Sequence, residues 1–342
     1  MGPHPPRTEH DLEDLLSTPT AALVEAMRAL EGDLLVLGAS GKMGPSLARL
    51  AVRACGAAGA PRRIIAAGRF SRPGIRETLD RSGVETIVCD LFSPQELDAL
   101  PQVENVIFMA GQKFGSTDDP SGTWATNTYL TGAALQRFPN ARWVVFSTGN
   151  VYPMSPASGD GPSEADGTGP VGDYAQSALA RERVVEFFAH RNETAVSILR
   201  LNYAVELRYG VLRDIADRVR RSEPIDLSMG YVNLIWQGDA NARVLCALAR
   251  GAVPPFVLNL TGPKAAVRHI AHRIGEIWNI EPMFVGTEAD TALLSDPRRS
   301  FELFGPPEVT LERMTRLVAD WVARGGASLE QPTHYQERHG QF

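Results

Sequence analysis

The stretch LLVLGASGKMG, residues 34–44, joins an apolar run to a glycine-rich turn, and a helical pattern of apolar residues follows it. Its glycines stand in GxxGxxG spacing, which allows a tight turn and lets the backbone approach a bound pyrophosphate. The phosphate would lie at the N-terminus of the next helix, where unpaired N–H groups point towards it. A tight turn needs glycine for steric reasons too, so the motif depends on its context. The candidate ligand-binding residues here are Gly38, Ser40, Gly41, Lys42, Met43 and Gly44.

Short apolar runs alternate with amphipathic helical stretches between residues 33 and 201. The runs cover residues 34–37, 64–67, 86–89, 106–109, 143–146 and 196–199. Continuous apolar runs are typical of parallel strands that are buried on both faces. The pattern predicts an α/β fold with a doubly wound parallel sheet of the Rossmann type. After the first strand of such a sheet, the glycine motif predicts dinucleotide binding.

The remaining segments predict a smaller C-terminal substrate-binding domain beside this sheet. We expect a helical extension at residues 1–31, the dinucleotide-binding domain at 32–201 with 231–262 returning to it, the substrate-binding domain at 202–230 and 263–326, and a polar tail at 327–342. Residues 153–170 are rich in Gly, Pro, Ser and Asp, which predicts a surface loop over the carboxyl ends of the strands.

Composition excludes several classes of protein. The 342 residues are 44% hydrophobic and 22% charged, with a net charge of −6, as in ordinary globular proteins. This charge offers no broad attraction to nucleic acid or anionic membranes, so we expect neither as a partner. The chain shows no apolar stretch of membrane-spanning length and no secretory signal, so we expect a cytoplasmic protein. Cys55, Cys89 and Cys246 lie too far apart for a disulfide framework or zinc site, and we expect no metal.

The residues after the second and third runs bear on the type of dinucleotide. The second run ends in GRFSR, residues 68–72, where an acidic residue would bind the ribose of NAD. Arg69 there favours NADP, because arginine suits a 2′-phosphate. NAD remains the alternative, since an arginine also lies flat over an adenine or belongs to a solvated turn. Asp90 and Leu91 follow the third run, beside the expected adenine, although plain loop residues are equally expected there.

Four further motifs complete the pattern. They are AGQKFG at 110–115, TNTY at 126–129, FSTGNVY at 146–152, and a spaced motif of Glu164, Pro170, Tyr174, Ser177 and Glu182. Together with the glycine turn they resemble the extended short-chain dehydrogenase/reductase superfamily, and within it the NAD(P)-dependent epimerase/dehydratase family that acts mostly on sugars. The resemblance covers about residues 33–325.

This resemblance implies roles for residues after the fourth run. AGQKFG looks like the AGxKxxG segment of UDP-galactose 4-epimerases, in which the lysine approaches the cofactor phosphates. It implies cofactor contacts for Ala110, Gly111 and Lys113. Asn127 matches a helix asparagine that holds the active-site geometry, although Leu130 replaces the glycine that usually follows it.

The resemblance also implies the catalytic groups. Thr148 stands at the position of the catalytic hydroxyl, and Tyr174 at that of the tyrosine that acts as general acid/base and contacts the cofactor. Sugar 4,6-dehydratases of this family carry Asp-Glu directly after the hydroxyl. Gly149 and Asn150 stand there instead, which disfavours dehydration.

The family's lysine, four residues after the tyrosine, is Ala178 in this chain. That lysine lowers the pKa of the tyrosine, which without a neighbouring charge titrates near ~10. Three interpretations remain. Tyr174 acts in its neutral form with another base, or the site is silent and the protein is a cofactor-binding sensor, or a displaced cation replaces the lysine. Candidate cations are Lys42 and Lys113, and, at seven and nine residues along the same helix, the poorly placed Arg181 and Arg183.

Two segments bear on the substrate. Residues 200–203, RLNY, resemble the family's RPxN stretch, whose asparagine contacts substrate, and residues 232–239 resemble RDFIHVDD. In nucleotide-sugar enzymes the first arginine of RDFIHVDD grips the diphosphate, and Val232 replaces it here. We therefore favour a free sugar, sugar acid, lactone or other small polyol, unless Arg220 or Arg221 compensates. The candidate substrate-binding residues are Thr148, Asn150, Asn202, Trp236 and Gln237, with core packing as the other interpretation of Trp236.

The sequence thus predicts an NAD(P)-dependent oxidoreductase or epimerase that acts on a hydroxyl-bearing carbon of a sugar or sugar-derived molecule. The alternative is a catalytically silent cofactor-binding sensor or regulator of the same fold. The resemblance further implies a homodimer formed through the helices around Asn127 and Tyr174.

Overall fold

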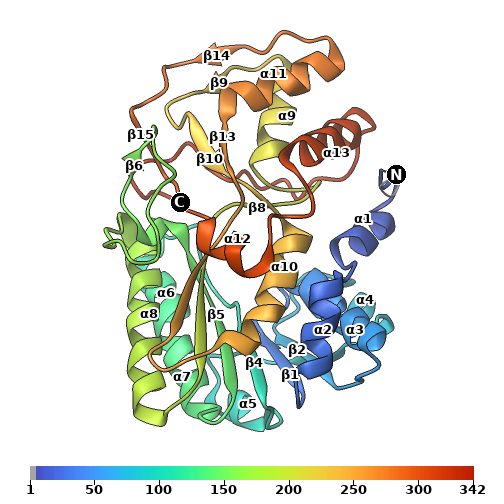
Figure 1. The fold of residues 1–342 in the computed structure, drawn as a ribbon, viewed down its shortest axis with the longest axis vertical. Helices are drawn as coiled ribbons and strands as arrows, with labels where there is room; N and C mark the ends of the chain where they lie inside the picture. Colours follow the sequence, from blue (N-terminus) through green and yellow to red (C-terminus); the bar gives the residue numbers. More distant parts are fainter. Residues whose placement is uncertain (1–4) are drawn as a thin grey trace.

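A seven-stranded parallel sheet forms the centre of the computed structural model, which describes residues 5–342 (Figure 1). The strands follow the order β12-β7-β5-β4-β1-β2-β3. Their bounds are β1 (Leu34–Leu37), β2 (Ile64–Gly68), β3 (Glu85–Val88), β4 (Asn105–Phe108), β5 (Arg142–Thr148), β7 (Val196–Leu201) and β12 (Phe256–Leu260). Each predicted apolar run forms a strand, and the strand order reverses between β1 and β4, so the doubly wound Rossmann-type sheet is confirmed.

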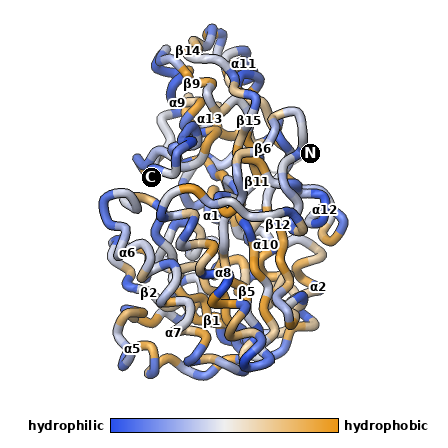
Figure 2. Tube along the Cα trace, turned by 90° about the vertical axis from the view of Figure 1, so that its left-hand side faces the viewer, coloured by the Kyte–Doolittle hydropathy of each residue, from blue (hydrophilic) through white to orange (hydrophobic). Residues whose placement is uncertain are grey.

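Helices cover both faces of this sheet. One face packs against α2 (Ala21–Ala29), α3 (Gly44–Ala58) and α10 (Gln237–Cys246), and the other against α5 (Pro94–Ala99), α7 (Leu130–Arg137) and α8 (Gly172–Asn192). Alternate residues of β1 show this, because Leu34 and Val36 belong to one apolar cluster and Leu35 and Leu37 to the other. Figure 2 shows the resulting concentration of hydrophobic residues along the central strands. Across residues 5–342, no helix combines the length and apolarity that crossing a membrane requires.

An upper lobe with its own apolar cluster sits above the carboxyl ends of the strands (Figure 1). Its helices are α9 (Val211–Arg221), α11 (Val267–Trp278) and α13 (Leu311–Ala323). Its short strands pair as β10 (Tyr231–Asn233) with β13 (Lys264–Ala266), and as β9 (Ile225–Asp226) with β14 (Phe284–Val285).

The remaining elements are short. The strand pairs are β6 (Ser155–Pro156) with β15 (Thr291–Ala292), and β8 (Ala204–Val205) with β11 (Ile235–Trp236). The short helices are α1 (Glu9–Leu16), α4 (Ile75–Arg81), α6 (Pro120–Trp124), the π-helical η1 (Ala125–Tyr129), the 3-10 turns η2 (Gly149–Val151) and η3 (Ala247–Arg250), and α12 (Arg298–Phe304).

The N-terminal segment contacts both lobes. Pro19 separates its two helices, as the spacing of apolar residues predicts. Leu12 and Leu16 of α1 are buried in the apolar cluster of the upper lobe, whereas Leu23 and Met27 of α2 are buried beside the sheet.

Residues 327–342 are polar, but they do not form a loose tail. Tyr335 is 3% exposed and belongs to the apolar cluster of the upper lobe. The Arg338 guanidinium donates hydrogen bonds to the carbonyl oxygens of Ser228 and Thr291 at 3.0 and 2.9 Å. Because an aromatic ring is buried and polar groups find partners on the protein, the segment lies against the fold.

A buried polar network links four elements beneath the carboxyl edge of the sheet. The guanidinium of Arg200 in β7 donates to Glu182 of α8 at 2.7 Å and to the Tyr152 hydroxyl at 2.7 Å. Tyr152 in turn donates to Asn259 Oδ1 of β12 at 2.8 Å. The Ser147 hydroxyl of β5 donates to Glu182 as well. Arg200 and Glu182 are almost fully buried, so each depends on the other for charge compensation.

We predict that Glu182→Gln lowers the free energy of unfolding by about 3–5 kcal/mol, because it leaves the Arg200 charge buried without a counter-charge. The control is Glu186→Gln on the same helix, whose partner Arg183 and own carboxylate are exposed. This control costs about 1 kcal/mol or less. Urea unfolding followed by circular dichroism measures both changes, and equal losses in the two variants contradict the prediction.

Candidate active site

Two adjoining cavities open at the carboxyl ends of β1, β4, β5 and β7. The glycine-turn cavity has a volume of about 300 Å³, and the smaller Asn202 cavity one of about 130 Å³. Both are lined by Lys42, Met43, Lys113, Thr148 and Tyr174. The first is also lined by Gly38, Gly41, Gly111, Asn127, Ala178 and Arg181, and the second by Asn150, Asn202, Tyr203 and Thr333. Most of the predicted catalytic and cofactor residues therefore meet at one place.

The glycine turn fits a bound pyrophosphate. Gly38 has a φ of +82°, and a Cβ on it would lie 2.5 Å from the backbone nitrogen of Ala110, so the fold itself requires this glycine. A Cβ on Gly41 would meet only one carbonyl oxygen, at 3.4 Å, so the fold does not require glycine there. Gly41 lines the cavity, and Met43, the N-cap residue of α3, makes no side-chain cap. The bare backbone and the uncapped N–H groups form a cradle for phosphate oxygens.

Six predicted cofactor residues do not line the two cavities: Ser40, Gly44, Arg69, Asp90, Leu91 and Ala110. The Ser40 carbonyl oxygen accepts a hydrogen bond from Arg72 at 3.3 Å. Asp90 accepts the N–H of Phe92, and Leu91 packs in the apolar cluster beneath β3. The Leu91 side chain is thus part of the core, and a cofactor contact by this residue stays a prediction.

Arg181 places a guanidinium in the wall of the glycine-turn cavity. Its Nε donates to the Asn127 carbonyl at 2.6 Å, Nη1 to the Phe146 carbonyl at 2.7 Å, and Nη2 to the Ala110 carbonyl at 2.8 Å. Burial lowers the pKa of Arg181 to about 10, so the group stays charged at neutral pH. Its hydrogen-bond partners are all carbonyl oxygens, which compensate the charge only with dipoles. The positive charge therefore remains available to act on a neighbouring group.

The position of Arg181 corrects the expectation that a residue seven places after Tyr174 is poorly placed. Seven residues make almost two helical turns, so Tyr174, Ala178 and Arg181 share one face of α8. Side chains on a helix lean towards its N-terminus, and the small Ala178 leaves room for the arginine to extend past it. Arg183, the other candidate on this helix, pairs with Glu186 on the exposed face.

Tyr174 holds its proton in this arrangement. Burial raises the pKa of Tyr174, while a hydrogen bond with the Thr148 side chain and the charge of Arg181 lower it, and the net shift is upward. The group is therefore a phenol at neutral pH. Thr148 also accepts the N–H of Asn150 at 3.2 Å, which orients its hydroxyl at the end of β5. The site thus combines a displaced cation with a neutral tyrosine.

Two lysines complete the charge of the site. Burial lowers the pKa of Lys42 to about 7 and that of Lys113 to about 8. Lys42 donates to the Ala204 carbonyl at 3.2 Å, and Lys113 to the Thr333 carbonyl at 3.3 Å. Neither forms an ion pair with a carboxylate of residues 5–342. An anionic ligand in these cavities would raise both pKa values and be attracted in return.

Asn127 lies in the π-helical turn η1, a rare conformation that recurs at functional sites. Its Nδ2 donates to the Gln112 carbonyl at 3.0 Å and to the Ser177 hydroxyl at 2.9 Å. Its Oδ1 accepts the N–H of Gln112 and a bond from Arg181. These bonds attach the loop after β4 to α8 and agree with a positioning role.

The Asn202 cavity contains an unsatisfied polar group. Asn202 Nδ2 is buried and has no hydrogen-bond partner among the described residues, and neither has the Ser295 hydroxyl. Both lie against Gly149, where a Cβ would stand 2.9 Å from Ser295 Oγ and 3.0 Å from Asn202 Cγ. Buried polar groups without partners carry a cost, so a polar ligand would be favoured here.

Trp236 and Gln237 do not line either cavity, which corrects their prediction as substrate-binding residues. Trp236 is 2% exposed and packs in the cluster of the upper lobe, as its alternative interpretation states. Gln237 donates to the Ser46 hydroxyl at 2.9 Å. Both stand where β11 leads into α10, a turn that directs them into the core.

Tyr209 lines both cavities and was not predicted. Lys42 Nζ lies 3.6 Å from the centroid of its ring. Tyr209 stands in the irregular segment after β8, which matches no motif. The contact with Lys42 joins residues far apart in the chain, so no pattern along the sequence could reveal it.

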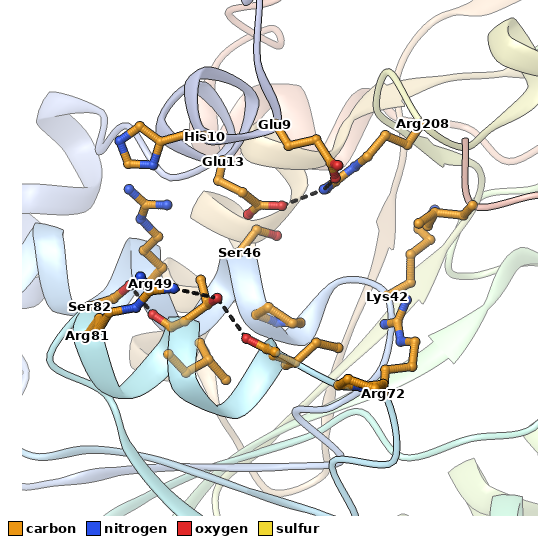
Figure 3. A pocket seen from close by; sticks show the side chains of 17 residues that line it. Glu9, His10, Glu13, Lys42, Ser46, Arg49, Arg72, Arg81, Ser82 and Arg208 are labelled. Atoms are coloured by element: carbon orange, nitrogen blue, oxygen red, sulfur yellow. Dashed lines mark hydrogen bonds and ion pairs between the residues drawn. The ribbon is translucent and has the colours of Figure 1, made fainter. Parts of the chain in front are cut away.

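A third cavity, of about 540 Å³, lies beyond Lys42 between α1, α3 and α4. Figure 3 shows Lys42, Arg72 and Arg208 at one side of it, and Arg49 and Arg81 at the other. Arg208 pairs with carboxylates of α1, and Arg49 pairs with Asp14. Arg72 has no carboxylate partner among the described residues, so its charge is available next to the glycine turn.

Comparisons with known proteins agree with this architecture. Residues 34–206, just over half of the chain, match the model of the NAD dependent epimerase/dehydratase family. No curated protein matches the sequence. Among solved structures, UDP-glucuronic acid 4-epimerase from Bacillus cereus, in complex with UDP-glucuronic acid and NAD, superposes with a TM-score of 0.70 at 16% identity over 85% of this chain and 99% of that chain.

Two other solved structures are similar. UDP-glucose 4-epimerase from Thermotoga maritima, with UDP-glucose, gives a TM-score of 0.69 at 20% identity over 86% of this chain and 99% of that one. UDP-glucose 4-epimerase from Thermus thermophilus, in complex with NAD, gives a TM-score of 0.69 at 20% identity over 84% of this chain and 98% of that one. The resemblance read from the motifs is thereby confirmed: the chain belongs to the NAD dependent epimerase/dehydratase family.

Proposed function

We propose that this protein is an NADP(H)-preferring enzyme that oxidises, reduces or epimerises a hydroxyl-bearing carbon of a sugar or sugar-derived molecule. The observation that carries the proposal is the meeting of Tyr174, Thr148 and the Arg181 guanidinium in one cavity with the glycine turn. Membership of an NAD dependent family supports a nicotinamide cofactor. The silent-sensor alternative rested on the alanine at position 178, and the charge of Arg181 removes that support.

The side chains divide the work of the reaction. A nicotinamide bound beside Tyr174 supplies the exchange of a hydride with the substrate carbon. Tyr174 donates its phenolic proton to the substrate oxygen during reduction and takes it back during oxidation. The Thr148 hydroxyl, held at the end of β5, binds the same oxygen. Arg181 stabilises the phenolate that Tyr174 becomes after it has given up its proton.

We predict that Tyr174→Phe lowers kcat about 10²–10⁴-fold, because the reaction loses its proton donor. Tyr129→Phe is the control, since Tyr129 is 59% exposed on the neighbouring helical turn. Steady-state assays over a panel of sugars and sugar acids with NADPH and NADP⁺ measure the effect, and NADPH binding shows that both variants are folded. An unchanged kcat/KM in Tyr174→Phe removes this residue from the mechanism.

The charge of Arg181 predicts a pH effect whose sign is defined. Alcohol oxidation requires the phenolate, so its rate rises as pH rises through the pKa of Tyr174. Arg181→Met removes a charge that lowers this pKa, so the pH–rate midpoint for oxidation moves up by about one unit or more. Arg181→Lys keeps the charge and moves the midpoint less. Adding Ala178→Lys to the Arg181→Met variant supplies a new charge and moves the midpoint back down. The kcat/KM pH profile measures all three, and a midpoint independent of charge contradicts the assignment.

Arg72 is the residue we propose for the preference between cofactors. Arg69 is exposed and forms no hydrogen bond or ion pair with residues 5–342, whereas Arg72 is hydrogen-bonded to the Ser40 carbonyl and lines the third cavity with Lys42. A 2′-phosphate next to the glycine turn would meet this charge first.

We predict that Arg72→Ala weakens NADPH binding about tenfold or more and changes NADH binding little, because only NADPH carries the 2′-phosphate. Arg69→Ala has a smaller effect, and Arg81→Ala at the other side of the cavity serves as the control. Energy transfer from the tryptophans to the reduced nicotinamide measures each Kd. An equal loss for NADPH and NADH in Arg72→Ala would refute the assignment.

A further inference from the structure

The segment 333–342 contacts the catalytic groups directly. Thr333 lines the Asn202 cavity, and its carbonyl oxygen accepts the hydrogen bond from Lys113. The Phe342 ring packs edge-to-face on the Tyr174 ring with 5.7 Å between centroids, and Lys113 Nζ lies 4.3 Å from the Phe342 centroid. One short segment therefore contacts both Tyr174 and Lys113.

Anchors on both lobes keep the segment in this place. Thr333 donates from its backbone N–H and its hydroxyl to Asp214 of α9, at 2.9 and 2.5 Å. The Arg338 guanidinium reaches the Thr291 hydroxyl at 2.6 Å in addition to its two carbonyl partners. At the other end, Phe342 exchanges hydrogen bonds with the residues before α6, Ser116 and Thr117.

The space left behind the segment is small. The Asn202 cavity measures about 130 Å³, whereas sites for drug-sized ligands measure about 300–1,000 Å³. Lys42 and Lys113 are the cations that line this cavity, and no arginine of the described chain joins them in its lining. Val232 is apolar and buried, and the Arg338 donors are used by Ser228 and Thr291. A nucleotide diphosphate would need both more room and concentrated positive charge.

We propose that residues 333–342 are a wall of the active site that limits the substrate to a molecule of monosaccharide size without a nucleotide diphosphate. This inference rests on the proposed function and specifies its substrate class. Asn202, which lines this cavity and whose buried Nδ2 has no partner among the described residues, is a polar side chain that the hydroxyl groups of such a molecule would meet. Phe342 is the part of this wall that packs on the Tyr174 ring.

The first test needs no known substrate. Hydrogen–deuterium exchange is measured on the full chain with and without NADPH, for the wild type, Arg338→Ala and the control His339→Ala, whose side chain is exposed. We expect the amides of Thr333 and Phe342 to exchange at least about tenfold more slowly than in an unstructured peptide, because both are hydrogen-bonded. Arg338→Ala speeds this exchange and His339→Ala does not. Exchange at the unstructured rate in the wild type overturns the proposal.

The second test measures the size limit. UDP-glucose and UDP-glucuronic acid are titrated into the NADPH-bound wild type and the double variant Arg338→Ala/Phe342→Ala, with His339→Ala as the control. We expect the double variant to bind these probes at least about tenfold more tightly than the wild type, and the wild type to turn over free sugars or sugar acids only. Equal binding by both proteins, or none by either, counts against the wall. Failure of the wild type to bind NADPH refutes the proposed function instead. In that case the hydrogen–deuterium exchange experiment alone tests whether residues 333–342 form the wall.

Discussion

The buried charge of Arg181 is the interaction on which the rest of the site depends. A guanidinium away from water is stable only when its N–H groups find acceptors. Here the acceptors are the carbonyl oxygens at the ends of β4 and β5 and that of Asn127 in the π-helical turn. The three elements are held at distances that satisfy one planar group, and this places the cation on the same face of α8 as Tyr174.

The next residue of α8 attaches the helix to the sheet a second time. Glu182 turns to the other side and pairs with Arg200 of β7, below the cavities. Two neighbouring residues of opposite charge therefore bind different parts of the sheet. Arg181 binds carbonyl oxygens near the strand ends, and Glu182 binds Arg200 below the cavities. The upper lobe and the segment 333–342 close over the same strand ends from above. The cavity therefore lies between a rigid floor and a wall made by residues distant in sequence.

The motifs in the sequence predict most of the floor. GxxGxxG after the first strand, AGQKFG, FSTGNVY and the tyrosine motif bring Gly41, Lys113, Thr148 and Tyr174 together, because parallel strands all end at one edge of the sheet. The sequence patterns predict less well whether a given side chain points into the core or into the cavity. Trp236 lies within a recognised motif but packs in the core. Arg181 stands seven residues after Tyr174, and only its place on the same face of α8 brings it to the tyrosine.

The sequence by itself determined the strands, their burial on both faces of a parallel sheet, and the phosphate turn. These features follow from local apolar runs and glycine spacing. Only the tertiary structure decided which cation serves Tyr174 and what encloses the substrate. Both depend on long-range contacts: Arg181 reaches carbonyls of distant strands, and Phe342 meets Tyr174 across the fold. Such contacts form between segments whose separation in the chain carries no periodicity, so no local pattern encodes them.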